Sequence, residues 1–91
     1  MRVIRKRVGE MFEFADIENT LRTLQEEVGG YIEIYPINDY TLIVCNEEGR
    51  LRGLPYNVTI SGVPFVGNIL IVGADDDDFT DVPLDCVSVL S

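Results

Sequence analysis

Val28 to Gly49 read V-G-G-Y-I-E-I-Y-P-I-N-D-Y-T-L-I-V-C-N-E-E-G, and this stretch decides the fold of the chain. Gly29-Gly30 can supply the left-handed residue that ends a helix. The alternating residues Tyr31 to Tyr35 predict a half-buried strand. The apolar run Thr41 to Cys45 predicts a strand that is covered on both faces. The stretch therefore predicts a helix that ends at the two glycines and two strands directly after it.

The alternation assigns the side chains of the first of these strands to two faces. Ile32 and Ile34 are expected to face the core, and the residues between them to face outward. Pro36 is expected to end the strand, and Asn38-Asp39 to make the turn that follows. The outward side chains are therefore candidates for contact with a partner, and they are Tyr31, Glu33 and Tyr35.

The end of the stretch predicts a turn. Asn46-Glu47-Glu48-Gly49 has the composition of a hairpin turn, in which Gly49 is free to take a positive φ. Arg50 to Leu54 is then expected to start back along the sheet. The acidic turn residues Glu47 and Glu48 are solvent-exposed in this interpretation.

Upstream of the stretch, the pattern predicts two strands and a helix. Arg2 to Val8 reads as a first strand, and its basic residues suit an exposed edge of the sheet. Met11 to Ala15 reads as its hairpin partner. The helix follows from one apolar stripe and from a capping residue, Asn19 or Thr20. The stripe consists of Ile17, Leu21, Leu24 and Val28.

Downstream of the stretch, turn residues alternate with apolar runs. Gly53 to Gly67 is rich in glycine and proline, and predicts an ordered loop with one short strand, Val58 to Ser61. Asn68 to Gly73 predicts a second buried strand. Asp75 to Asp78 predicts a solvated loop, because like charges so close together repel. The tail is ambiguous between helix and strand over residues 84–90, with a short helical turn after Pro83 favoured.

These elements predict a single α+β domain over residues 1–91. The order is two strands, a helix, two strands, a further short strand and a last strand. They form a mostly antiparallel sheet with the main helix on one face. The apolar fraction of 46% is sufficient for one modest core, and no apolar run is long enough to span a bilayer. A cytoplasmic location is the resulting expectation.

The charge is negative and unevenly distributed. The net charge is −9, and all sixteen acidic residues follow Val8, whereas four of the seven basic residues precede it. Such a surface is expected to repel nucleic acid and anionic lipid, so a partner is expected to be a basic protein. Cys45 and Cys86 are expected to be buried small hydrophobes rather than a disulfide framework.

The sequence contains no recognisable catalytic constellation. It has no histidine, which removes the Ser-His and Cys-His pairs and histidine-based zinc sites. No cofactor motif is present, and the protein is not expected to be an enzyme. The acidic residues Asp75, Asp77, Asp78 and Asp81 are weak candidates for a divalent cation, because oxygen ligands suit Ca²⁺ or Mg²⁺ but their spacing is not that of an EF-hand.

Three motifs together resemble a known family. They are V-G-G-Y-I-E-I (Val28 to Ile34), V-C-N-E-E-G-R-L-R-G-L-P-Y-N (Val44 to Asn57) and V-G-N-I-L-I-V-G (Val66 to Gly73). In this order they resemble the family called domain of unknown function 3846. The resemblance implies a small protein of bacterial, phage or mobile-element context. It also implies an acidic or polar stretch and a short C-terminal helix at the end of the chain, and it supplies no catalytic residue.

Three functional hypotheses remain open at the level of sequence. The first is a non-enzymatic accessory module that binds a protein. The second is a small-ligand or divalent-metal regulator, in which the loop Gly53 to Gly67 closes over a pocket and Tyr56, Asn57 and Asn68 are the polar groups of interest. The third is an acidic decoy that mimics DNA. The candidate partner surface comprises Tyr31, Glu33, Tyr35, Glu47, Glu48, Asp75, Asp76, Asp77 and Asp78.

Overall fold

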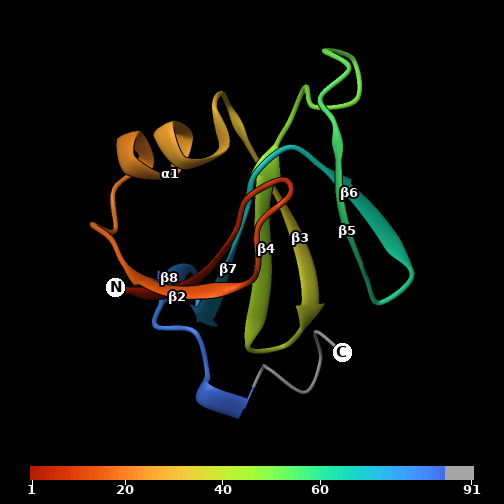
Figure 1. Ribbon diagram of the computed structural model, residues 1–91. Coiled ribbons are helices and arrows are strands. Elements are labelled where there is room, and N and C mark those ends of the chain that lie inside the picture. The colour runs from red at the N-terminus through yellow and green to blue at the C-terminus, as the bar shows by residue number, and fades with distance from the viewer. Residues whose placement is uncertain (86–91) are drawn as a thin grey trace.

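The computed structural model describes residues 1–85 and forms one α+β domain around a mostly antiparallel sheet (Figure 1). Within these residues, one helix and eight strands follow one another. Their bounds are β1 (Arg2–Lys6), β2 (Glu13–Asp16), α1 (Leu21–Val28), β3 (Ile32–Asn38), β4 (Thr41–Asn46), β5 (Tyr56–Ile60), β6 (Val63–Val66), β7 (Ile69–Asp75) and β8 (Asp78–Thr80).

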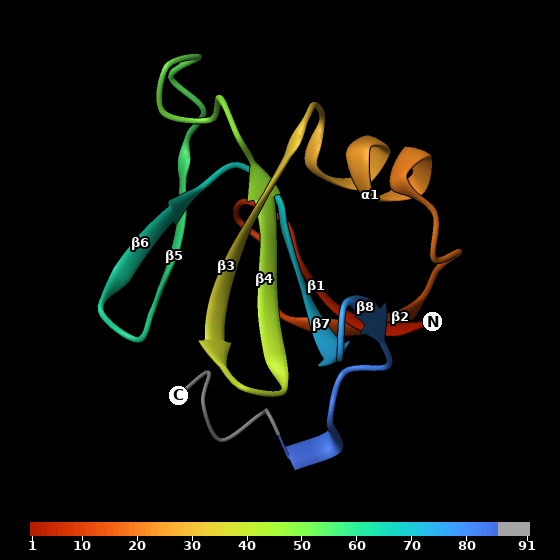
Figure 2. The same cartoon turned by 180° about the vertical axis from the view of Figure 1, so that it is seen from behind.

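The main sheet is centred on β7, which pairs with β1 on one side and with β4 on the other. The strand order is β2-β1-β7-β4-β3, and the short β8 also pairs with β7 (Figure 2). The apolar runs expected to form buried strands are therefore the two central strands, β4 and β7. Val44 and Leu70 lie opposite each other in this pair, and both are buried.

Helix α1 covers one face of the sheet. Its first turn is capped by Thr20, whose hydroxyl accepts a hydrogen bond from the backbone N–H of Thr23 at 3.2 Å. Gly29 ends the helix in the left-handed conformation, with φ at 78°, as expected from the two glycines. Leu24 and Val28 pack against apolar residues of the central strands, as the apolar stripe predicts, whereas Leu21 of the same stripe is 58% exposed.

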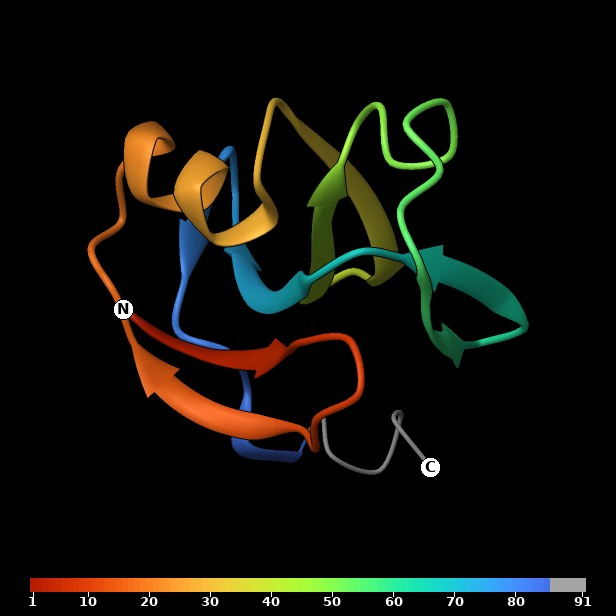
Figure 3. The ribbon, with the colours of Figure 1, turned by 45° about the horizontal axis from the view of Figure 1, so that its top comes forward.

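The hairpin β5–β6 covers the opposite face (Figure 3). Ile60 and Phe65 pack into a cluster with residues of β4 and β7. The sequence predicts only one strand between Gly53 and Gly67. The second strand forms because Ser61 and Gly62 both adopt positive φ, 52° and 78°, which is the geometry of a two-residue hairpin turn.

The prediction that the first strand lies at an edge is wrong. β1 lies between β2 and β7, and its basic side chains are bound within the molecule. Arg5 donates to both carboxylate oxygens of Glu27 on α1, at 2.6 and 3.0 Å, and also contacts Glu13 on β2. These carboxylates, Glu27 foremost, raise the pKa of Arg5 above its ordinary value. The pairing explains why a charged residue is tolerated in an internal strand and why Glu27 lies in the last turn of the helix.

Two local predictions around the opening stretch are also wrong. Strand β3 continues through Pro36 to Asn38, which is tolerated because β3 is at the edge of the sheet. Gly49 does not take a positive φ. It is buried, and a Cβ there would lie 2.9 Å from Val66, so close packing requires the glycine.

Two other segments differ from expectation. Residues 50–53 form turns instead of starting a strand. Asp75 to Asp78 is exposed as expected, but it is a tight hairpin rather than an irregular loop, with Asp75 and Asp78 paired across β7 and β8. Leu84 and Asp85 form a short helical turn after Pro83, whereas Cys86 and the rest of the tail lie outside the described residues.

Candidate functional site

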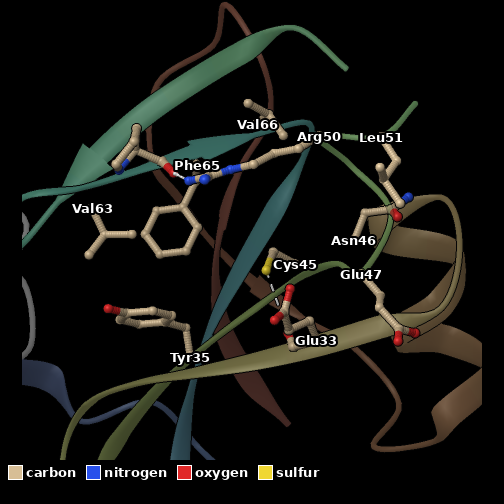
Figure 4. A pocket seen from close by; sticks show the side chains of 11 residues that line it. Glu33, Tyr35, Cys45, Asn46, Glu47, Arg50, Leu51, Val63, Phe65 and Val66 are labelled. Carbon is tan, nitrogen blue, oxygen red and sulfur yellow. Dashed lines mark hydrogen bonds between the residues drawn. The ribbon is translucent and has the colours of Figure 1, made fainter. Parts of the chain in front are cut away.

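A cleft of about 340 Å³ lies between the edge strand β3, the end of β4 and strand β6. Figure 4 shows Tyr35 and Phe65 on one side of this cleft, Glu47 and Leu51 on the other, and Cys45 and Glu33 between them. Strand β6 and the loop that follows β4 form its outer walls. The cleft is lined by Glu33, Tyr35, Cys45, Asn46, Glu47, Arg50, Leu51, Val63, Pro64, Phe65 and Val66.

The alternation of β3 places Glu33 and Tyr35 in the cleft. Glu33 lies opposite Cys45, which packs on the hairpin side of the sheet, so the side chains of Glu33 and Tyr35 point to that same side. The ring of Tyr35 meets that of Phe65 edge to face, with centroids 5.7 Å apart and an angle of 86°. The strand therefore presents one carboxylate and one aromatic side chain to the cleft.

Asn46 positions the loop that carries Glu47. It is only 6% exposed, and its side chain links two segments: it donates to the carbonyl of Val28 at 3.2 Å and accepts from the N–H of Glu48 at 2.8 Å. Gly30 leaves the space for this contact, because a Cβ there would lie 2.9 Å from the amide nitrogen of Asn46. The second glycine after the helix thus leaves room for the loop, and its N–H also bonds to the carbonyl of Gln25 at the helix end, at 3.1 Å.

The charge of the cleft is predominantly negative. Glu33 and Glu47 form no salt bridge within residues 1–85. Arg50 is the only basic residue that lines the cleft within this described part of the chain, and it donates to the carbonyl oxygen of Pro64 at 3.1 Å. Each of the seven basic side chains has an intramolecular hydrogen-bond partner, and no ion pair within residues 1–85 joins any of them to Glu33 or Glu47.

Cys45 is expected to be a poorly reactive thiol. Burial, followed by the negative charge of Glu33, raises the pKa of Cys45 to about 11, and Arg50 opposes this rise only in part. The thiol therefore stays protonated until the pH approaches 11, whereas the unfolded chain ionises near 9.0. In a Cys86→Ser variant at pH 8, we expect iodoacetamide to alkylate the native protein at least about tenfold more slowly than the urea-unfolded chain. Equal rates in the two states would contradict this.

The residues predicted to form a partner surface lie in three separate places. Glu33, Tyr35 and Glu47 converge on the cleft. Tyr31 and Glu48 line a neighbouring hollow of about 240 Å³ at the end of the helix, together with Arg52. Asp75 to Asp78 lies at the other end of the sheet, since Ala74 bonds to Tyr40, which precedes β4, whereas Glu47 follows β4.

The candidate metal ligands do not converge within the described residues. Among residues 1–85, no three His, Cys, Asp or Glu side chains are grouped as a cation would need. Asp78 accepts from the N–H of Phe79, and Asp81 accepts from the N–H of Arg2 at 2.8 Å. These two carboxylates thus hold backbone groups in place.

The polar groups proposed for a ligand loop are also engaged within the fold. Asn57 donates to the carbonyls of Lys6 and Gly67 at 2.8 and 2.7 Å, and accepts from the ammonium of Lys6. Asn68 accepts from the N–H of Val8, and the hydroxyl of Tyr56 contacts Thr59. The two asparagines fasten the hairpin and β7 to the first strand and the turn after it rather than lining the cleft.

Sequence reasoning missed the walls of the cleft. Phe65 and Val63 come from a segment that is predicted to be loop, and their role depends on the second strand of the hairpin. Leu51 comes from a segment that is predicted to start back along the sheet but forms a turn. The dipeptide Ser61-Gly62 is the signal that could have revealed it, because Ser-Gly between two apolar runs marks a tight turn. Arg50 carries no such signal, since its partner Pro64 is distant in the sequence.

The fold and the cleft define a small α+β domain with an acidic, aromatic-lined cleft. The chain belongs to the family described as Domain of unknown function (DUF3846), whose model matches residues 1–90. The resemblance of the three motifs is thereby confirmed. Comparison with curated proteins gave no match, and comparison with solved structures gave none. Within the described part of the chain, no helix has the length and apolar character needed to cross a membrane.

Proposed function

We propose that this protein is a non-enzymatic accessory module of the cytoplasm that binds a basic segment of a partner protein in the cleft between β3 and β6. The observation that carries the proposal is the convergence of Glu33, Tyr35 and Glu47 on one cleft. Glu47 is separated in the sequence from the other two and joins them only through the pairing of β3 with β4. A bacterial or mobile-element origin is consistent with this role.

Electrostatics favour a cationic occupant. Two carboxylates that form no salt bridge within the described residues lie beside apolar walls, and a lysine or arginine side chain would supply both the charge and the aliphatic stem that such a site accommodates. The protein as a whole is acidic, with a net charge of −9, so its field attracts basic partners over some distance.

The exposed apolar residues favour a macromolecular partner. Leu51 is 90% exposed at the rim of the cleft, and Tyr35 is 42% exposed within it. Exposed aliphatic and aromatic groups next to a rim of charge are typical of protein contact sites. A small polar ligand would leave Leu51 in water. This difference supports the binding of a protein segment over the alternative of a small-ligand regulator.

The decoy hypothesis has less support. A DNA mimic needs a continuous row of negative charge, whereas the acidic groups considered for a partner surface are divided between the cleft end of the sheet and the Asp75–Asp78 hairpin at its opposite end. We therefore keep the decoy and the divalent-metal regulator as alternatives without assigning them a site.

The proposal is tested with a double variant, Glu33→Gln and Glu47→Gln. We expect it to bind an acetylated, amidated peptide of alternating lysine and valine about tenfold more weakly than the wild type does. The reason is that two charge-assisted contacts of modest strength are lost. Isothermal titration calorimetry at about 0.1 M salt and at a higher salt concentration measures the affinity and the extent to which salt weakens it.

The matched control is Asp76→Asn with Asp77→Asn, which makes the same change in net charge at the other end of the sheet. We expect this variant to bind within about twofold of the wild type at about 0.1 M salt, because the length of β4, roughly 20 Å, places both carboxylates beyond a Debye length from the cleft. Equal losses in the two double variants would mean that only net charge matters. That result, or no binding to the wild type, would overturn the proposal.

A further inference from the structure

The outer edge of β3 has no neighbouring strand within the described residues. β3 is the last strand of the main sheet, and β6 belongs to a separate two-stranded sheet that packs on one face. Residues 33–36 are all exposed. An exposed strand edge of this kind can accept a further strand from another chain.

The register identifies the groups that face the open edge. The N–H of Glu47 bonds to the carbonyl of Tyr31 at 2.8 Å, so Tyr31 and Glu47 form a hydrogen-bonded pair. Because bonded and non-bonded pairs alternate in an antiparallel ladder, Glu33 and Tyr35 direct their backbone groups toward β4. The residues between them, Ile32, Ile34 and Pro36, therefore direct theirs toward the open edge, although Pro36 offers only its carbonyl.

The two faces beside this edge differ in chemistry. Glu33 and Tyr35 point into the cleft. Ile32 and Ile34 point to the helix side, where Ile34 is 43% exposed. In an added strand, successive side chains would lie alternately beside Glu33 and Tyr35 on one face and beside Ile32 and Ile34 on the other. The complementary partner has basic residues opposite Glu33 and apolar residues opposite Ile34.

We infer that the partner segment binds as an added antiparallel strand along β3, with alternating basic and apolar side chains. This inference rests on the proposed function and specifies its partner: an extended peptide whose basic side chains enter the cleft. The edge is short, since the Pro36 N–H is missing and the register shifts between Pro36 and Asn38. The paired segment therefore covers the part of β3 from Ile32 to Pro36.

A second copy of the same protein fits this edge less well. Self-pairing centred on Glu33 places two carboxylates directly opposite each other. Self-pairing centred on Ile34 places Pro36 opposite Ile32, which loses a hydrogen bond. In both registers, two chains of net charge −9 approach each other.

The test uses two methylated forms of one peptide of alternating lysine and valine. In antiparallel pairing, the valines opposite Ile34 direct their N–H groups to β3, and the lysines direct theirs away. N-methylation of the valines should weaken binding about tenfold or more, because the shared backbone bonds are lost. N-methylation of the lysines should change the affinity by less than about threefold. Equal affinities of the two forms, or a loss only in the second, would overturn the inference.

Amide hydrogen exchange supplies a second readout within β3. On addition of the unmethylated peptide, we expect protection of the Ile32 and Ile34 amides to rise about tenfold or more, with the Glu33 and Tyr35 amides unchanged because they already bond to β4. Binding without this protection would be consistent with the acidic cleft as the binding site but would exclude the addition of a strand to β3. Failure of the unmethylated peptide to bind would instead count against the proposed function itself. If sedimentation velocity shows a dimer that forms through β3, the edge binds a second copy of the protein instead of a peptide, and the inference is overturned.

Discussion

Gly73→Ala is expected to destabilise the protein by about 3 kcal/mol or more. Gly73 lies in the central strand β7, between Thr41 of β4 and Thr80 of β8. A Cβ at this position would collide with the backbone carbonyl of Asp81. The backbone around Asp81 cannot easily move away, because Asp81 and Val82 are both hydrogen-bonded to Arg2.

Urea unfolding followed by circular dichroism measures this loss, and Gly9→Ala is the control. Gly9 has a φ of 77°, and a Cβ added there would have no atom within 4 Å. Alanine at this position therefore costs only the left-handed conformation, about 1 kcal/mol. If both variants lose the same stability, the close contact between β7 and residue 81 does not exist as described.

Phe65→Ala is expected to cost about 3–4 kcal/mol and to remove peptide binding. Phe65 is only 5% exposed, and its ring packs both against the β4–β7 face and against Tyr35. Without it, the hairpin β5–β6 loses its main apolar anchor and the cleft loses one wall. The same residue therefore links the stability of the hairpin to the shape of the site.

Phe65→Leu is the matched variant for this prediction, since it keeps an apolar side chain in the same space. We expect a loss of about 1 kcal/mol and a folded hairpin. The chemical shifts of the Tyr35 ring report directly on the edge-to-face contact. A stable Phe65→Ala protein with unchanged Tyr35 shifts would contradict the role assigned to Phe65.

The layer architecture is predictable because its signals are local. The apolar runs at Thr41 to Cys45 and Asn68 to Gly73 form the two central strands, and the period of Leu24 and Val28 gives the face of the helix. Each of these features depends on the burial of residues that are close together in the sequence, so the spacing of apolar residues is enough to predict it.

The remaining features depend on partners that are distant in the sequence. Pro36 ends a strand in most contexts, and only the edge position of β3 allows it to remain within one. Arg5 reads as an exposed edge charge because its partner Glu27 lies on the helix, 22 residues away. The cleft itself is formed by β3, the loop after β4 and β6, so its outward acids can be identified from sequence but their convergence cannot.

Residue-resolved mapping of a basic peptide on the protein tests the central claim most directly. In a ¹⁵N–¹H correlation titration with the alternating lysine–valine peptide, we predict that the largest shift changes occur at Glu33, Tyr35 and Glu47, with little change at Asp76 and Asp77. Changes centred on the Asp75–Asp78 hairpin, or spread evenly over all acidic residues, would contradict the assignment of the binding site to the cleft between β3 and β6.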